Sequence, residues 1–83
     1  MDIPRIKTLL AQGREIELYY NGKLYFLAPS YLDGESIGKY SIYDDQEQCT
    51  IFVGGIDAVL AFDFANGNSL DSAFHLFDIA YVL

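Results

Sequence analysis

The chain has 83 residues, of which 52% are hydrophobic and 20% are charged, and its formal net charge is −7. This length allows one domain with one hydrophobic core, residues 1–83, and the composition is that of an ordered globular protein. The charge argues against nucleic acid as a partner, because residues 40–83 contain seven Asp or Glu residues and no Lys or Arg, whereas phosphate contacts need cations.

The single cysteine and the absence of long apolar runs bear on the location of the protein. Cys49 cannot form a disulfide within the chain, which favours a reducing, cytoplasmic location. No apolar run approaches the roughly 18 residues of a membrane span, and no apolar run follows the first charged residues as it would in a signal peptide. We therefore expect a cytoplasmic protein without a membrane partner.

The first predicted element is a short helix over residues 4–12. Pro4 suits the first helical turn, where its missing N–H group costs nothing. Gly13 is well placed as the left-handed residue that ends the helix. The helix has one apolar face at helical spacing, formed by Ile6, Leu9 and Leu10.

The strongest structural signal is a β-hairpin over residues 15–27, with Asn21-Gly22 as its two-residue turn. This dipeptide favours a type I′ turn, because both positions need a positive φ. The turn sets the pairing, with Tyr20 opposite Lys23 and Glu17 opposite Phe26. One face is the natural core face and consists of Ile16, Leu18, Tyr20, Lys23, Tyr25 and Leu27. The other face is unusually apolar for a solvated surface and consists of Glu15, Glu17, Tyr19, Leu24, Phe26 and Ala28.

The middle of the chain predicts a loop and two further strands. Residues 29–36 are rich in turn formers and are interpreted as a loop with a tight turn at Asp33-Gly34. Residues 39–44 alternate and predict a third strand, and residues 49–53 are β-branched and aromatic and predict a fourth.

The last third predicts two helices and an apolar end. Residues 56–62 fit a short helix after Gly54-Gly55, and residues 69–77 fit a second helix with Asn68 or Ser69 as its N-cap. Residues 79–83 are apolar, which predicts that they either dock on the core as an edge strand or contact another chain.

Together these elements predict a small α+β fold. We expect an antiparallel sheet of three to five strands, with an N-terminal helix and one or two C-terminal helices packed on one face.

The hairpin also carries a resemblance to known sequences. The stretch Arg14-Glu15-Ile16-Glu17-Leu18-Tyr19-Tyr20-Asn21-Gly22-Lys23, after a short helix and before the helix start at residues 67–70, resembles small uncharacterised proteins of Gram-positive bacteria and their mobile elements. The similarity covers the hairpin and, more loosely, the second half. It implies an α+β fold, and it supplies no activity and no catalytic residues.

No residue pattern in the chain predicts catalysis. His75 has Asp71, Ser72 and Asp78 within four positions, and Ser, His and Asp are the residues of nucleophilic catalysis. Adjacent turns of one helix rarely aim such groups correctly, so a surface histidine is the favoured interpretation. Cys49 has only carboxylates nearby in sequence, which would raise the pKa of a thiol, and we interpret it as a small core residue.

No pattern predicts a metal or a cofactor either. Asp44, Asp45 and Glu47 form an acidic turn, but they lack the Gly-centred loop of a calcium hand, and a solvated turn is the favoured interpretation. Gly54-Gly55 could cradle an anion, but no Lys and no further glycine follow at phosphate-loop spacing. We expect neither metal nor cofactor.

The function we predict is that of a non-catalytic protein-interaction or self-assembling protein. The candidate interface is formed by Tyr19, Leu24 and Phe26, and a homodimer is the simplest cover for it. A helix or the C-terminal tail folded over the same face is the competing interpretation. The alternative function is an acidic inhibitor from a mobile element that presents Asp44, Asp45 and Glu47 to a basic protein.

Overall fold

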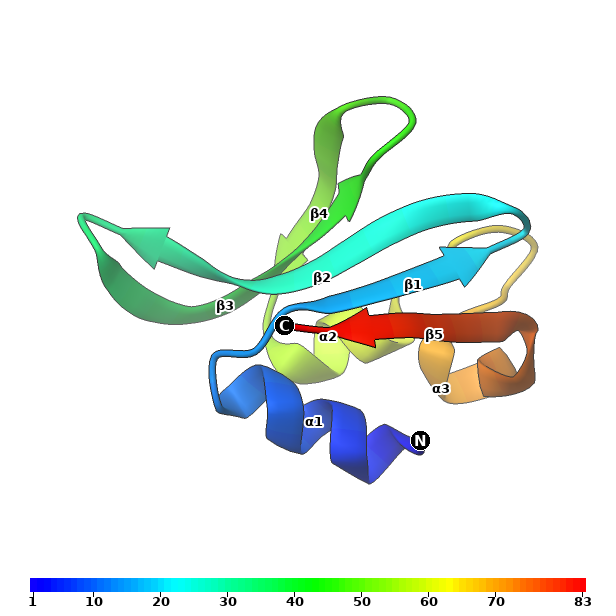
Figure 1. Cartoon of the computed structure of the whole chain (residues 1–83), viewed down its shortest axis with the longest axis horizontal. Coiled ribbons are helices and arrows are strands. Elements are labelled where there is room, and N and C mark those ends of the chain that lie inside the picture. Colours follow the sequence, from blue (N-terminus) through cyan, green and yellow to red (C-terminus); the bar gives the residue numbers. More distant parts are fainter.

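One antiparallel sheet, with three α-helices on one side of it, forms the structure, a computed structural model that describes residues 1–83 (Figure 1). The elements in chain order are α1 (Ile3–Ala11), β1 (Ile16–Tyr20), β2 (Lys23–Leu32), β3 (Glu35–Asp44), β4 (Cys49–Gly54), α2 (Ile56–Ala61), α3 (Leu70–Ala73), the 3-10 turn η1 (Phe74–Leu76) and β5 (Phe77–Val82). The predicted α+β fold is confirmed.

The sheet has five strands in the order β4-β3-β2-β1-β5. The first four strands are joined by consecutive hairpins, and β5 returns from the helical side to pair with β1. The apolar C-terminal segment is therefore an edge strand of the sheet. It does not cover either face, so the interpretation in which the tail folds over the outer hairpin face is wrong.

The first hairpin has the predicted turn and pairing. Asn21 and Gly22 have φ angles of 51° and 77°, as a type I′ turn requires. The strands pair from Tyr20 opposite Lys23 to Ile16 opposite Leu27. This pairing places the two faces of the hairpin as the alternation predicts.

The loop predicted over residues 29–36 is wrong, because β2 and β3 continue through it as a second hairpin. Asp33 and Gly34 form its two-residue turn, with φ angles of 51° and 81°. Pro29 is tolerated because the pairing is irregular between Pro29 and Tyr31, so its missing N–H group leaves a local break and not a lost strand. The end of this hairpin, residues 30–39, projects beyond the rest of the sheet and is called the arm (Figure 1).

The hydrophobic core lies between the sheet and the helices. From the sheet it takes Ile16, Leu18, Leu27 and Ile42, all fully buried. The helices contribute Ile6, Leu9, Leu10, Val59, Leu60 and Leu70, so that the predicted apolar face of residues 4–12 is confirmed. An aromatic cluster extends the core, with Tyr20 stacked on Phe77 at 4.8 Å and Phe64 edge-on to both Tyr25 and Phe77.

The helix predicted over residues 69–77 is shorter than expected. Of the two predicted N-caps, Asn68 and Ser69, it is Ser69 that caps α3, and its hydroxyl accepts a hydrogen bond from the Ser72 N–H. The helix ends at Ala73, however, and β5 begins at Phe77. The apolar run from Phe77 to Val82 satisfies the free edge of β1, and this long-range pairing prevails over the helical spacing of the preceding residues.

Candidate functional site

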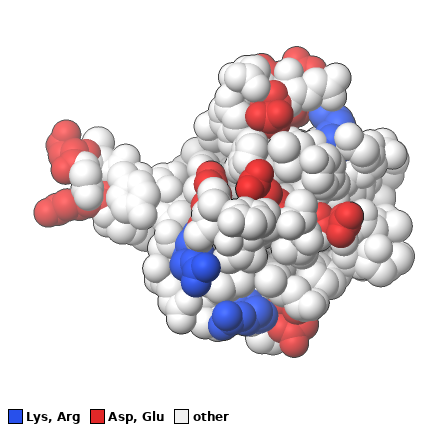
Figure 2. Space-filling model, in the orientation of Figure 1, with Lys and Arg blue, Asp and Glu red and all other residues white.

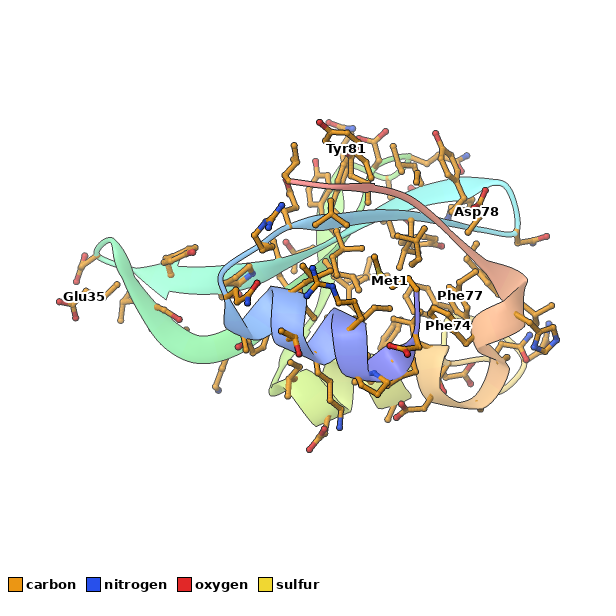
Figure 3. All side chains as sticks on the ribbon, turned by 60° about the horizontal axis from the view of Figure 1, so that its bottom comes forward. Met1, Glu35, Phe74, Phe77, Asp78 and Tyr81 are labelled. Atoms are coloured by element: carbon orange, nitrogen blue, oxygen red, sulfur yellow. The ribbon has the colours of Figure 1, made fainter.

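The side of the sheet away from the helices has no covering element, and we call it the open face. The strand pairing aligns its side chains in rows: Asp78, Tyr19 and Leu24 in one, and Tyr81, Glu17, Phe26, Tyr43 and Thr50 in the next. Figure 3 shows Asp78 and Tyr81 on this side and Phe77 on the helical side of the same strand. The open face comprises Glu15, Glu17, Tyr19, Leu24, Phe26, Ala28, Ser41, Tyr43, Thr50, Val53, Asp78 and Tyr81.

The three predicted interface residues lie together on the open face. Tyr19 is 42% exposed and pairs with Leu24, which is half-buried, as is Phe26. The ring of Phe26 lies 6.0 Å from that of Tyr43. No helix covers these side chains, since every helix packs on the other face.

Sequence reasoning missed two further tyrosines of the open face, Tyr43 and Tyr81. Tyr81 is 57% exposed and lies opposite Glu17. The alternation of residues 39–44 puts Tyr43 on the side of the strand opposite to the apolar Ile42. It could therefore have identified Tyr43 as a residue of the outer face, together with Ser41. Tyr81 could not be placed in this way, because β5 is irregular between its pairings with Glu17 and Leu18.

Carboxylates lie among these aromatic rings without cationic partners. Glu17 is half-buried between Tyr81 and Phe26, and Glu15 is half-buried beside them. The only ion pairs in the structure are Lys7–Asp57 and Lys23–Asp44. None of the residues of the open face is Lys or Arg, so this face is both aromatic and acidic.

A shallow hollow of about 360 Å³ opens on this face. Phe26 and Tyr43 supply two aromatic rings, and Glu15 supplies a carboxylate. The remaining lining residues are Ala28, Ser41 and Thr50. The hollow thus combines apolar surface, hydroxyl groups and one negative charge.

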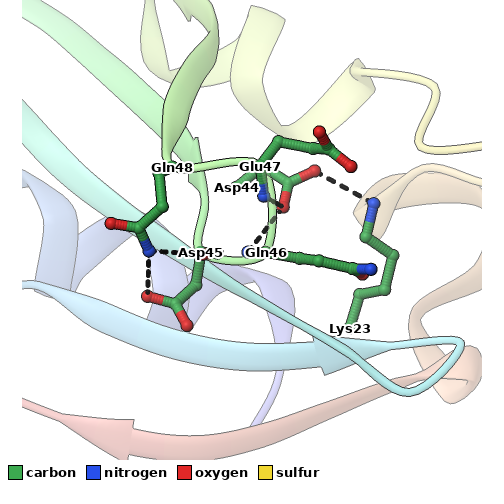
Figure 4. A network of polar contacts seen from close by, with 6 residues as sticks. All are labelled: Lys23, Asp44, Asp45, Gln46, Glu47 and Gln48. Atoms are coloured by element: carbon green, nitrogen blue, oxygen red, sulfur yellow. Dashed lines mark hydrogen bonds and ion pairs between the residues drawn. The ribbon is translucent and has the colours of Figure 1, made fainter.

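The acidic turn is built around Asp44, which is only 3% exposed (Figure 4). Its carboxylate accepts hydrogen bonds from the backbone N–H groups of Gln46 and Glu47, at 3.0 and 3.1 Å, and from Lys23 Nζ at 3.0 Å. The Glu47 N–H group and the Lys23 ammonium hold the pKa of Asp44 below its usual value. The hydrogen bond to Asp44 correspondingly raises the pKa of Lys23.

This network changes the interpretation of the predicted acidic patch. The carboxylate of Asp44 is directed into the turn and toward Lys23, so it is not presented to solvent as the sequence suggested. Asp45 is half-buried, and Glu47 is exposed. The patch available to a partner is therefore reduced to Asp45 and Glu47.

The remaining chemical candidates lie apart from the open face. His75 is exposed in η1, and the Ser72 hydroxyl is occupied by the Ser69 cap and the Gly67 carbonyl oxygen. Cys49 is exposed, so its assignment to the core is wrong; it begins the edge strand directly after a turn, where no helix covers it. No group of three or more His, Cys, Asp or Glu side chains is arranged to hold a metal ion.

Comparisons of the chain with protein-family models, with curated proteins and with solved structures return no match. None of the helices is long and apolar enough to cross a membrane. The resemblance of the hairpin to small bacterial proteins stays a prediction. The residues of the open face are therefore the basis for the function proposed below.

Proposed function

We propose that this chain is a non-catalytic protein-interaction protein whose open face is covered by another protein chain in its working state. The proposal is supported by the packing of all helices on one face of the sheet. The opposite face has no covering element and presents Tyr19, Leu24, Phe26, Tyr43 and Tyr81.

The chemistry of this face supports binding to protein. Tyrosine side chains are enriched among the residues that dominate binding energy, because they bury a large area and keep a polar group for hydrogen bonding. Exposed apolar patches on small proteins mark interaction sites more often than isolated apolar residues do. The open face has both features over five adjacent strands.

The sequence suggests that a second copy of the chain binds the open face. The position of Glu17 argues against such a homodimer. In a symmetric face-to-face dimer, the unpaired Glu17 carboxylates of both copies would be desolvated among aromatic rings. Each copy also has a net charge of −7, so two copies repel at long range. We therefore favour a partner of different sequence and expect the isolated protein to be monomeric by its mass in solution.

The acidic inhibitor suggested by the sequence would be a special case of this function. Figure 2 shows Asp and Glu side chains at the end of the arm, around the β3–β4 turn and over the visible face. Lys and Arg side chains are few in the same view. This charge distribution favours a basic protein partner by long-range attraction.

Site-specific photo-crosslinking tests the proposal. A photoreactive p-benzoyl-phenylalanine replaces Tyr81, which is 57% exposed on the open face, and in a second variant it replaces Leu76, which is 45% exposed outside that face. In the cells that express the protein, we expect one defined adduct from position 81 and none from position 76. The adduct mass distinguishes a second copy from another protein.

A double variant, Tyr19→Ser with Phe26→Ser, provides the second arm of the test. Because both rings lie on the open face and outside the core cluster, the variant should keep its fold by circular dichroism while the adduct at position 81 is lost. An unfolded double variant, or adducts of equal yield from both positions, would refute the proposal.

A further inference from the structure

The hollow on the open face has the composition of a site for a cationic side chain. The Phe26 and Tyr43 rings that line it lie 6.0 Å apart with their planes inclined by 43°. Cations are attracted to the faces of aromatic rings, and guanidinium groups stack on them. A hollow lined by two aromatic residues therefore favours a flat positive group over a neutral one.

The carboxylate of Glu15 completes this site and has no partner within the chain. It makes no ion pair, and no hydrogen bond to its side chain is present. The adjacent cation, Arg14, is directed elsewhere, since its Nε donates to the carbonyl oxygen of Leu83 at 2.7 Å. A negative charge thus stays unneutralised at a half-buried position beside two aromatic rings.

We propose that this hollow binds the guanidinium group of an arginine side chain from a basic protein partner. Arginine fits better than lysine, because its planar group can stack on Phe26 and Tyr43 while it donates two hydrogen bonds to the Glu15 carboxylate. The Ser41 and Thr50 side chains line the same hollow, and their hydroxyl oxygens can accept hydrogen bonds from the remaining N–H groups, although the Ser41 hydroxyl already donates to the Ala28 carbonyl oxygen.

The occupant is a basic protein and not a second copy, on grounds of charge. The chain has 12 Asp or Glu residues against 5 Lys or Arg residues, so a basic surface is attracted and a second copy is repelled. This inference rests on the proposed function, since it names the class of partner that the open face receives.

The test uses two small probes that differ in charge and have almost the same shape. Capped arginine amide and capped citrulline amide are titrated into the isotope-labelled protein, and amide chemical shifts are followed by NMR. We expect millimolar binding of the arginine probe, with shifts centred on Glu15, Phe26, Tyr43 and their neighbours. The citrulline probe should bind about three- to fivefold more weakly, as the loss of an exposed cation–aromatic contact predicts.

Two matched variants test whether the arginine probe binds at the hollow. Glu15→Gln removes the charge in the hollow and should weaken arginine binding by about three- to fivefold, whereas Glu35→Gln, a carboxylate at the exposed end of the arm, should leave it unchanged. Equal binding of both probes, or equal loss in both variants, would overturn the inference. A defined crosslink from position 81 together with either of these results would refute the arginine site and leave the proposed interaction function standing.

Discussion

At the scale of single residues, Asp44 determines the geometry of the β3–β4 turn. A buried carboxylate is destabilising unless its charge is compensated, and here two backbone N–H groups and the Lys23 ammonium compensate it. The sequence placed Asp44 in an acidic surface cluster, although the alternation of residues 39–44 puts it on the same side of the strand as Ile42. The local pattern does not show which cation compensates its charge. The pairing of β2 with β3, which brings Lys23 beside the turn, decides this.

Replacing Asp44 by asparagine should lower the stability of the fold at neutral pH. It should also make that stability depend less on pH in the acidic range. The pKa of Asp44 is below its usual value in the fold, so its stabilising contribution is complete above the unfolded carboxyl pKa of about 3.9 and is lost as the pH falls through the lower folded pKa. Thermal unfolding measured across acidic pH should therefore show a smaller loss for Asp44→Asn than for the natural chain. Parallel pH profiles would contradict this assignment.

Gly54 is required for steric reasons at the junction of β4 and α2. A Cβ atom there would lie 2.9 Å from the Phe52 ring and 3.2 Å from Ala58 Cβ. Gly54→Ala should therefore destabilise the fold by about 1–3 kcal/mol. Gly55→Ala is the matched control, because its Cβ would meet nothing within 4 Å and its φ of −63° allows alanine; since Gly55 is the N-cap of α2, this variant should still cost less than about 1 kcal/mol. Urea unfolding of both variants measures the difference, and equal midpoints would refute the steric argument.

At the scale of elements, local signals predicted the turns and caps correctly, because each depends on a few adjacent residues. Asn21-Gly22 and Asp33-Gly34 both adopt the positive φ angles that their composition predicts. The errors occur where a partner distant in sequence decides the structure. Residues 29–32 become strand because β3 pairs with them, and Phe77 begins β5 because β1 has a free edge.

Ser69 is the local signal that starts α3, and its contribution can be measured. Ser69→Ala removes the hydrogen bond from the Ser72 N–H and should cost about 1 kcal/mol of stability. Faster hydrogen exchange of the Ser72 amide should accompany the loss. Ser36→Ala, at an exposed position of the arm, should change neither quantity, and an effect of equal size there would show that the cap is not responsible.

At the scale of the whole molecule, the sequence predicted that one face of the first hairpin is too apolar for solvent. It could not predict that the face stays uncovered, because that depends on where all helices and the C-terminal strand pack. The hollow could not be predicted from the sequence either, since its lining residues are Glu15 and residues of three different strands. The site thus depends on tertiary assembly, whereas the turns around it do not.

The position of β1 between β2 and β5 has a consequence for how the chain assembles in time. The hairpins from β1 to β4 join neighbours in sequence and can form early, whereas β5 reaches β1 across more than half of the chain. During synthesis, the outer edge of β1 therefore remains unpaired until residues 77–82 have been made. In that interval an unpaired strand edge is exposed to other nascent chains, so β5, which is made after β1–β4, is the strand that protects the edge of β1.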